Sequence, residues 1–407
     1  MLAPRLCCLD LDTFFVSVER LLDPSLRGKP VVVGGYRGGR GVVTSASYEV
    51  RAFGVRSGMS IREASELAPR DTAFVPGHGE AYGDYSRRAR EIVERFSPVV
   101  IAASIDEHYL DFRGCERLYR RAGDDDDDAT ILRVVRELTA AIDRELGLPA
   151  SAGIATSKSM AKVASNLAKP QGVLIVRAGT EAATLAPLAV RKLPGIGPVA
   201  EDKLRAVGIE TLGQLVSAPE ALLRPIFGSY SAGIRAASRG EGSDDVGRER
   251  PAFREHDPQG GVAGTISNER TFVETTADTA FEVLSGLCER VASRARQRGV
   301  LAGQLTLKLR YTDFHTISRG RTITPSNIDV ELHRIALELY REARVRDLGI
   351  RLLGIAVAKL RLDAVQLTLF DAGGRRSEAV DRVRNRFGYH AVHLATTIGG
   401  RSKRRVR

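Results

Sequence analysis

The sequence is poor in cysteine and has no long apolar run, and both absences narrow the classes of protein it can belong to. Its 407 residues include four cysteines, none spaced as Cys-x-x-Cys, so we expect a reduced, cytoplasmic chain without a disulfide framework. No apolar run approaches the roughly 18 residues that a membrane span needs, so we expect no such span. The opening residues, Met1–Arg5, lack the basic and apolar regions of a secretion signal.

Size and charge describe a folded protein of several domains. Dividing 407 residues by roughly 150 per domain gives two to four domains. Apolar residues make up 43% and charged residues 27%, which excludes disorder as the main state. Lys and Arg number 61 against 50 Asp and Glu, so the net charge is +11. This excess favours a polyanionic partner such as nucleic acid, although many basic proteins have no such partner.

The order of apolar segments predicts an α+β fold with two βαββαβ units. In the first unit, strands are expected near 6–9, 99–103, 109–112 and 150–155, and helices over 84–96 and around 131–142. This is the ferredoxin-like order, with residues 14–80 inserted after the first strand. In the second unit, strands are expected near 268–273, 304–311, 314–321 and 350–358, and helices over 276–297 and 328–343.

Between and within these units, three stretches have distinctive compositions. Residues 186–240 are a helical region punctuated by glycine and proline, and 241–260 are typical of a linker. Asp124–Asp128 is interpreted as a solvated loop rather than a cation site, because five adjacent acids lack a defined ligand geometry. The glycine-rich stretch Gly34–Gly41 has no Gly-Lys-Ser/Thr ending, so it is not a Walker A loop.

Three carboxylates from distant parts of the chain are expected at one edge of the first sheet. Asp10 ends the first strand, and Asp106 and Glu107 lie between two later strands. Clustered carboxylates repel one another unless cations neutralise them, and oxygen ligands without nearby Cys or paired His favour Mg²⁺ or Mn²⁺ over zinc. Because successive strand residues face opposite sides, Asp106 and Glu107 must lie in a turn or bulge, and spacing alone favours Asp10 with Asp106. Surface acids near turns would give the same pattern.

Several motifs, in order along the chain, resemble those of the Y-family (lesion-bypass) DNA polymerases. Leu9–Glu19 resembles the opening motif of that family, and Ser104–Glu107 resembles its second catalytic motif. Ser45–Met59 is similar to the fingers motif, and Ser151–Gly172 is similar to the stretch that closes the palm. The match runs from about residue 6 to 370, and its nearest branch looks like bacterial DNA polymerase IV.

The resemblance implies a right-hand polymerase with a ferredoxin-like βαββαβ palm, small fingers, a helical thumb and a βαββαβ little-finger domain. The expected divisions are palm 1–13 and 80–173, fingers 14–79, thumb 174–240, linker 241–260, little finger 261–362 and tail 363–407.

The implied activity is template-directed DNA synthesis, in which deoxynucleotides are added to a primer 3′-end with low fidelity and with tolerance of damaged templates. By resemblance, Asp10, Asp106 and Glu107 hold two Mg²⁺, for which Mn²⁺ can substitute, and the Leu11 carbonyl is a further ligand. Asp12 matches the motif but is interpreted as structural. Two alternatives remain open: a non-catalytic accessory scaffold that binds DNA and a sliding clamp, and a palm-type nucleotide cyclase.

Four residues are implied as triphosphate contacts: Ser45, Tyr48, Arg51 and Lys169. Tyr48 and Arg51 are three apart in an expected short helix, so their side chains should point the same way. A phenol and a guanidinium placed in this way can grip phosphate oxygens.

Two aromatic residues and one histidine lie beside these motifs. Phe14 and Phe15 fit a core position on pattern alone, but by resemblance they adjoin the nucleotide, and Phe15 is the steric gate that excludes a ribose 2′-hydroxyl. His108 stands where the family commonly has a small residue. It is expected to be a packing residue, with crowding of the site as the alternative.

Two regions are expected to hold DNA. Residues 191–209 are typical of a helix-hairpin-helix, whose glycines let backbone N–H groups approach a phosphate. In the second βαββαβ unit, basic residues alternate with apolar ones, so a basic outer sheet face would track a duplex; a merely solvated charged face is the alternative. The expected DNA contacts are Gly195, Gly197, Lys308, Arg310, Arg319 and Arg321.

The C-terminal tail contains a short apolar motif. Residues 366–370 resemble the pentapeptide with which bacterial polymerases bind the sliding clamp, through Gln366, Leu367, Leu369 and Phe370. A residual strand packed on its own domain is the alternative. The rest of the tail has one possible helix around 380–387 and is basic. The expected partners are primer–template DNA, deoxynucleoside triphosphates and a sliding clamp, with the chain as a monomer and no membrane.

Overall fold

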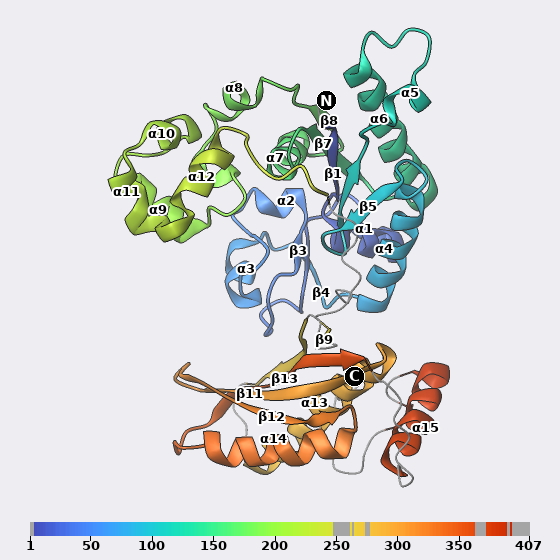
Figure 1. Cartoon of the computed structure of the whole chain (residues 1–407), viewed down its shortest axis with the longest axis vertical. Coiled ribbons are helices and arrows are strands. Elements are labelled where there is room, and N and C mark those ends of the chain that lie inside the picture. The colour runs from blue at the N-terminus through green and yellow to red at the C-terminus, as the bar shows by residue number, and fades with distance from the viewer. Residues whose placement is uncertain are drawn as a thin grey trace. The chain divides into compact units, whose positions relative to one another are not determined.

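The computed structural model describes residues 4–246, 261–262, 264–272, 277–362, 372–388 and 391–392. The chain divides into two compact units, Met1–Glu249 and Arg250–Arg407 (Figure 1). The division falls within the expected linker 241–260. The motif 366–370 expected to bind a clamp lies outside the described residues. Among the helices that are described, none combines the length and apolar character needed to cross a membrane.

The first unit is organised around a five-stranded sheet. Its strands, in spatial order, are β5 (Val99–Ala102), β6 (Glu107–Asp111), β1 (Leu6–Leu11), β7 (Ala150–Ala155) and β8 (Val173–Ile175). β1 is antiparallel to both β6 and β7, so the predicted ferredoxin-like order is confirmed. The sequence analysis missed β8, a three-residue strand parallel to β7.

The two faces of this sheet belong to different cores, because successive residues of β1 point to opposite sides. Leu9 and Leu11 pack with helices α4 (Gly79–Val93) and α6 (Asp127–Leu146). Cys8 packs on the other side with helix α7 (Lys158–Ala168). Asp10 has the same parity as Cys8, so its side chain lies on the α7 side.

A glycine brings α7 close to the sheet. A Cβ atom placed on Gly153, in the middle of β7, would lie 2.0 Å from the Ser165 backbone nitrogen and 2.3 Å from the Ala161 carbonyl oxygen. Real Cβ atoms do not approach backbone atoms so closely, so only glycine permits this contact. The close approach sets how near the polar side chains of α7 come to the end of β1.

The segment inserted after β1 packs partly on the main core and partly in a small core of its own. Phe14, Val16 and Val18 of helix α1 belong to the core under β1, whereas Val50 and Ile61 belong to a separate small core. The strands of this segment form a sheet in the order β3-β2-β4. Its elements are α1 (Phe14–Leu22), β2 (Val31–Val33), β3 (Ser45–Ala46), α2 (Tyr48–Arg51), α3 (Ile61–Leu67) and β4 (Ala73–Val75).

The helical region predicted over 186–240 is present. Its buried leucines share a core with α7, so it packs against the α7 side of the sheet. Its helices are α8 (Glu181–Leu185), α9 (Pro198–Ala206), α10 (Leu212–Ser217), α11 (Glu220–Phe227) and α12 (Ser231–Ser238).

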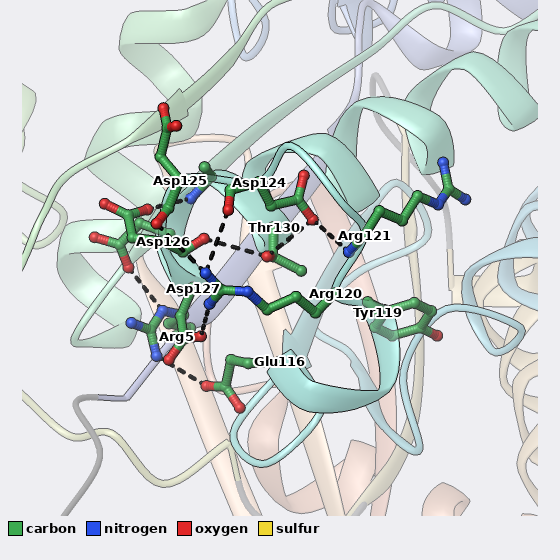
Figure 2. Close-up of polar contacts among 12 residues, drawn as sticks. Arg5, Glu116, Tyr119, Arg120, Arg121, Asp124, Asp125, Asp126, Asp127 and Thr130 are labelled. Carbon is green, nitrogen blue, oxygen red and sulfur yellow. Dashed lines mark hydrogen bonds and ion pairs between the residues drawn. The ribbon is translucent and has the colours of Figure 1, made fainter.

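The acidic run Asp124–Asp128 is not simply a solvated loop. Asp126 caps α6, since its carboxylate accepts the Ala129 N–H at 2.7 Å, and the helix begins at Asp127. Arginines pair with these acids. Arg120 bonds Asp127, and Arg5 bonds both Asp128 of the run and Glu116; Figure 2 shows Arg120 with Asp127 and Arg5 with Glu116. Acids in the first turn of a helix are favoured by the helix dipole. The run therefore starts a helix and anchors the N-terminal strand.

The second unit repeats the βαββαβ order, as predicted. Its sheet has the order β10 (Ile266–Thr271), β13 (Ile350–Leu362), β11 (Val300–Tyr311) and β12 (Thr316–Ser326), and β9 (Gly261–Val262) pairs with β13. Helices α13 (Ala277–Gln297) and α14 (Asp329–Ala343) share one apolar core with the sheet. The expected alternation along β11 is confirmed, with every second residue from Leu305 to Tyr311 fully buried.

The predicted tail helix is α15 (Ala372–Phe387), which belongs to the second unit. Arg384 bonds Glu289 of α13 at 2.8 Å, and both side chains are at most 3% exposed. Asp381 accepts from Arg296 at 2.6 Å and from the Ser293 hydroxyl at 3.0 Å. This helix is thus packed on α13 through buried ion pairs rather than extending as a free basic tail.

Candidate active site

The end of β1 brings the three predicted acids to one edge of the first sheet. Strand register pairs Asp10 with Glu107, the first residue of β6. Asp106 directly precedes β6, and its carbonyl oxygen accepts the Leu11 N–H at 2.9 Å. Asp106 is therefore outside the regular strand, as expected, whereas Glu107, which was expected in the same turn or bulge, is the first residue of β6.

Two of the three acids share a side-chain partner, and the third has a different one. The Asp10 and Glu107 carboxylates both bond the Lys162 ammonium, in the first case at 3.3 Å. The Asp106 carboxylate accepts the Ser104 hydroxyl at 2.5 Å. Spacing alone favoured Asp106 as the partner of Asp10, whereas in the structure Glu107 is the acid that shares a cation with Asp10.

Two lysines supply the neutralising charge that clustered acids need. Lys162 bridges Asp10 and Glu107, and the Lys169 ammonium bonds the second Asp10 oxygen at 2.5 Å. Among the described residues, no three His, Cys, Asp or Glu side chains converge on a point that would hold a metal ion. The sequence analysis did not assign Lys162 to the site; the rule that buried acids recruit cations was the available signal.

The chemistry of the donors fits a hard divalent cation. The side chains around the Asp10–Glu107 pair offer carboxylate oxygens, which Mg²⁺ and Mn²⁺ prefer. The Cys8 Sγ atom lies 3.8 Å from Glu107 Oε1, and burial raises the pKa of this thiol to about 12. Carboxylate oxygens predominate among these donors, so the donor set favours a hard cation.

Asp12 connects the acids to the residues expected to bind a triphosphate. Its side chain is 1% exposed and accepts the Ser151 hydroxyl at 2.7 Å, the Gln171 N–H at 2.8 Å and the Tyr48 hydroxyl at 3.3 Å. These bonds hold β7, α2 and the turn that follows Lys169 around one carboxylate. Asp12 therefore has the structural role that the sequence analysis gave it.

Tyr48 and Arg51 lie on one face of α2, as predicted. The Arg51 guanidinium carbon is 5.1 Å from the centre of the Tyr48 ring, and its Nε donates to the Ala46 carbonyl at 2.9 Å. Burial, and then the Asp12 carboxylate, raise the pKa of the Tyr48 phenol, so it stays protonated and can donate. Ser45 is buried in β3 next to this helix.

The two phenylalanines after β1 have different surroundings. Phe14 is 2% exposed and belongs to the core, as its pattern indicated. Phe15 is partly buried, and its ring stacks on that of Tyr82 with centres 4.3 Å apart. The Tyr82 hydroxyl donates to the buried carboxylate of Glu19, which also accepts the His78 N–H at 3.0 Å. One face of the Phe15 ring is thus fixed by a tyrosine that is itself anchored by a buried carboxylate.

His108 does not crowd the acids. Register pairs it with Leu9, so its ring faces the core under α4 and α6, and the residue is 1% exposed. Its Nδ1 atom has no hydrogen-bond partner among the described residues. Burial, and then the nearby Arg90, lower the pKa of His108 to about 4. The prediction that it is a packing residue agrees with this position.

The predicted helix-hairpin-helix glycines lie at the start of α9. Gly195 has φ of +100°, a conformation that favours glycine, and Gly197 is the residue before the first turn of α9. Both are exposed, while Ile196 between them is buried and anchors the turn. The turn can therefore present its backbone to an outside ligand.

The basic residues of the second sheet do not all share one face. Lys308 and Arg310 alternate with the buried residues of β11, so they lie on the outer face. Arg319 and Arg321 pair in register with Leu307 and Leu305, which places them on the helix-covered side. Their predicted position on the outer basic face is therefore wrong.

The ion pairs of Arg321 agree with this register. Its guanidinium bonds Glu338 and Glu342 of α14. The cause of the error is register, because a strand's parity shows which residues share a face but not which face that is.

Comparisons with known proteins agree with this architecture. The impB/mucB/samB family model matches residues 9–166, its C-terminal domain model matches 264–369, and its HHH-motif model matches 179–209. A DNA polymerase IV from Dehalococcoides mccartyi is 36% identical over 400 residues, 97% of each chain. One from Caulobacter vibrioides is 35% identical over 401 residues, 97% of this chain and 94% of its own length.

Solved structures show the same fold. A Y-family DNA polymerase chimera superposes with a TM-score of 0.72 at 24% identity, over 88% of this chain and 99% of its own. The insertion ternary complex of Dbh DNA polymerase gives a TM-score of 0.61 at 23% identity, with the same coverage. The solved structures share the fold, and the family models and the curated relatives show that the chain belongs to the impB/mucB/samB family of Y-family DNA polymerases, in its DNA polymerase IV branch.

Proposed function

We propose that this protein is a template-directed DNA polymerase that extends a primer 3′-end and tolerates damaged templates. The observation that carries the proposal is the gathering of Asp10, Asp106 and Glu107 at one end of β1 and β6, beside Tyr48 and Lys169. These residues come from four separate segments of the first unit: β1, α2, the start of β6 and the turn after α7. An accessory scaffold would have no use for such an arrangement, and a cyclase would have no use for the helix-hairpin-helix.

Divalent-cation dependence is part of the proposal, with two Mg²⁺ as the preferred ions and Mn²⁺ as a substitute. Asp10, Asp106, Glu107 and the Leu11 carbonyl would hold them. When bound, the ions lower the pKa of the primer hydroxyl and neutralise the triphosphate and the departing pyrophosphate. The carboxylate oxygens of these residues support this choice of metal.

Two of the residues proposed to bind the incoming nucleotide form hydrogen bonds or ion pairs with acids at the end of β1 in this structure. Lys169 bonds Asp10, and Tyr48 donates to Asp12, so each has one donor group already directed to this edge of the sheet. A triphosphate offers them stronger acceptors, and Arg51 adds a guanidinium that suits phosphate oxygens. Ser45 contributes a hydroxyl. The grip would therefore form by exchange of partners rather than by refolding.

Discrimination against ribonucleotides is assigned to Phe15. Its ring stacks on that of Tyr82, with ring centres 4.3 Å apart, and this contact restricts its movement. A rigid ring excludes the 2′-hydroxyl by contact, which requires no hydrogen bond to the sugar.

DNA is held by sequence-independent contacts. The exposed glycine turn before α9 and the outer face of the second sheet, with Lys308 and Arg310, would contact phosphates.

The division into palm, fingers, thumb and little finger is proposed with the boundaries given above, and the chain is proposed to act as a monomer. Binding of a sliding clamp through 366–370 is proposed from the sequence motif alone. Deleting 366–370 should abolish stimulation by the clamp and leave clamp-independent synthesis unchanged.

Primer extension is the direct test of the activity. The protein should extend a primer on a DNA template only when Mg²⁺ or Mn²⁺ is present. Asp106→Asn should abolish extension while leaving DNA binding intact, because it removes one carboxylate charge without changing volume. Extension by Asp106→Asn at the unsubstituted rate, or no extension by the unsubstituted chain, would contradict the proposal.

A further inference from the structure

Among the residues that the structure describes, Lys162 is the one whose side chain joins two of the three acids. It lies on the second turn of α7, and its ammonium bonds Glu107 and, at 3.3 Å, Asp10. The close approach of α7 to β7 at Gly153 brings this side chain to the end of β1. Lys169 also bonds Asp10, but its ammonium makes no ion pair with Glu107 among residues 4–246. The two lysines therefore have different tasks.

The surroundings of Lys162 make its charge important. The three side chains are only partly exposed, 23% for Lys162, 11% for Asp10 and 16% for Glu107. Like charges interact strongly where water is largely excluded, so two adjacent carboxylates need a cation between them. In the metal-free protein Lys162 provides that cation.

We propose that Lys162 is a positioning residue that holds Asp10 and Glu107 together before metal arrives, and that an incoming divalent ion must displace its ammonium from these oxygens. The proposal deepens the function proposed above and rests on it. An ammonium and a divalent cation both seek the oxygens of these two carboxylates. Lys162 thereby stabilises the empty site and weakens metal binding to it.

Removing this charge should have two opposite effects. Without the ammonium, Asp10 and Glu107 repel each other, so the metal-free protein should unfold at a lower temperature. The same carboxylates should bind a divalent ion more tightly, because no internal cation competes. A residue that only packed α7 against the sheet would give the first effect without the second.

The experiment compares Lys162→Met with the unsubstituted protein, without nucleotide or DNA. Free Mn²⁺ is measured by its electron paramagnetic resonance signal, and the unfolding temperature is measured in EDTA and in Mn²⁺. We expect Lys162→Met to bind Mn²⁺ several-fold more tightly than the unsubstituted chain. We also expect Mn²⁺ to raise the unfolding temperature of Lys162→Met, relative to EDTA, by more than it raises that of the unsubstituted chain. Equal or weaker Mn²⁺ binding by Lys162→Met would overturn the proposal.

Two further variants make the test specific. Lys158→Met removes the same charge from the first turn of α7, at a residue that makes no ion pair with these acids within residues 4–246, and should bind Mn²⁺ as the unsubstituted chain does. If Lys162→Met fails to fold, Lys162→Gln removes the charge while keeping a polar side chain and should show the same tighter binding. The two possible failures give different results. If the proposed function fails, the unsubstituted chain neither binds Mn²⁺ nor extends a primer. If only the proposal for Lys162 fails, the unsubstituted chain does both, and Lys162→Met binds Mn²⁺ no more tightly.

Discussion

Phe15 is the ring that we propose excludes a ribose 2′-hydroxyl, and its neighbours determine how firmly that ring is held. Phe15 stacks on Tyr82, and the Tyr82 hydroxyl is fixed by the buried carboxylate of Glu19 on α1. The ring of Phe15 on α1 is thus supported by Tyr82 of α4, which Glu19 ties back to α1. Steric exclusion requires such rigidity, since a mobile ring would move aside for one added oxygen.

Phe15→Val should therefore admit ribonucleotides. We expect the preference for deoxynucleotides over ribonucleotides to fall by about 100-fold, the scale on which a pocket distinguishes one small group. Single-nucleotide primer extension with each sugar measures the ratio. Phe14→Leu is the matched control, because Phe14 belongs to the core, so it should reduce stability and leave the ratio unchanged. An unchanged ratio in Phe15→Val would remove this residue from its assigned role.

His108 should make the protein sensitive to acid. Burial lowers its pKa to about 4 from the ordinary 6.5, so between these values the unfolded chain binds a proton that the folded chain excludes. The stabilising contribution is complete above pH 6.5 and is lost as the pH falls toward 4. From pH 7.5 to 5 the loss is about 2 kcal/mol.

His108→Gln removes the titrating ring and should lose less stability over this pH range. Denaturant unfolding at pH 7.5 and pH 5 gives the two free energies for each protein. The variant should start less stable at pH 7.5, because the smaller side chain leaves a void, but its decrease by pH 5 should be smaller. Equal decreases in both proteins would mean that other groups cause the acid sensitivity.

At the scale of elements, α15 is attached to α13 by ion pairs that water barely reaches. Arg384 and Glu289 are 3% and 0% exposed, and Arg296 bonds both Asp381 and Asp329. Leaving one member of a buried pair without its partner costs about 3–5 kcal/mol, whereas replacing both with apolar groups costs little.

Arg384→Met should therefore destabilise the second unit strongly, and Arg384→Met with Glu289→Met should restore much of the loss. Protease resistance of the full chain, followed for fragments of the second unit, compares the three proteins. The double variant is its own control for packing, because it keeps the methionine that the single variant introduces. Equal sensitivity of single and double variants would mean that the charges do not hold α15.

Elements could be predicted well where local pattern alone determines them. Alternation along β11 and helical spacing in α6 and α13 were sufficient to give both βαββαβ units. The acids were grouped because Asp10 ends the first predicted strand, and Asp106 and Glu107 lie between two later ones. Which face of a strand is covered by helices could not be predicted from local pattern. Arg319 and Arg321 were placed on the wrong face, because only the pairing of β12 with β11 in the folded protein determines which side is covered. The bridging position of Lys162 depends on how closely α7 packs on the sheet, which no spacing in the sequence expresses.

At the scale of the whole molecule, the net charge of +11 makes attraction to DNA general, so the question is which charges contact it. Lys308 and Arg310 lie on the outer face of the second sheet, whereas Arg321 is engaged by two glutamates of α14. Lys308 also pairs with Glu269 at 2.9 Å, so Arg310 is expected to contribute more. All three have the same formal charge.

The salt dependence of DNA binding separates these arginines and lysines by position. Each phosphate contact releases counterions, so removing one lowers the slope of log affinity against log salt by about 1. Lys308→Ala with Arg310→Ala should therefore lower the slope by up to about 2, equally for unrelated DNA sequences, because phosphates carry no base identity. Arg321→Ala removes a charge of the same sign from the same sheet and should leave the slope unchanged. Fluorescence anisotropy titrations at several salt concentrations give the slopes, and a slope reduced by Arg321→Ala but not by the double variant would mean that DNA lies against the other side of the sheet.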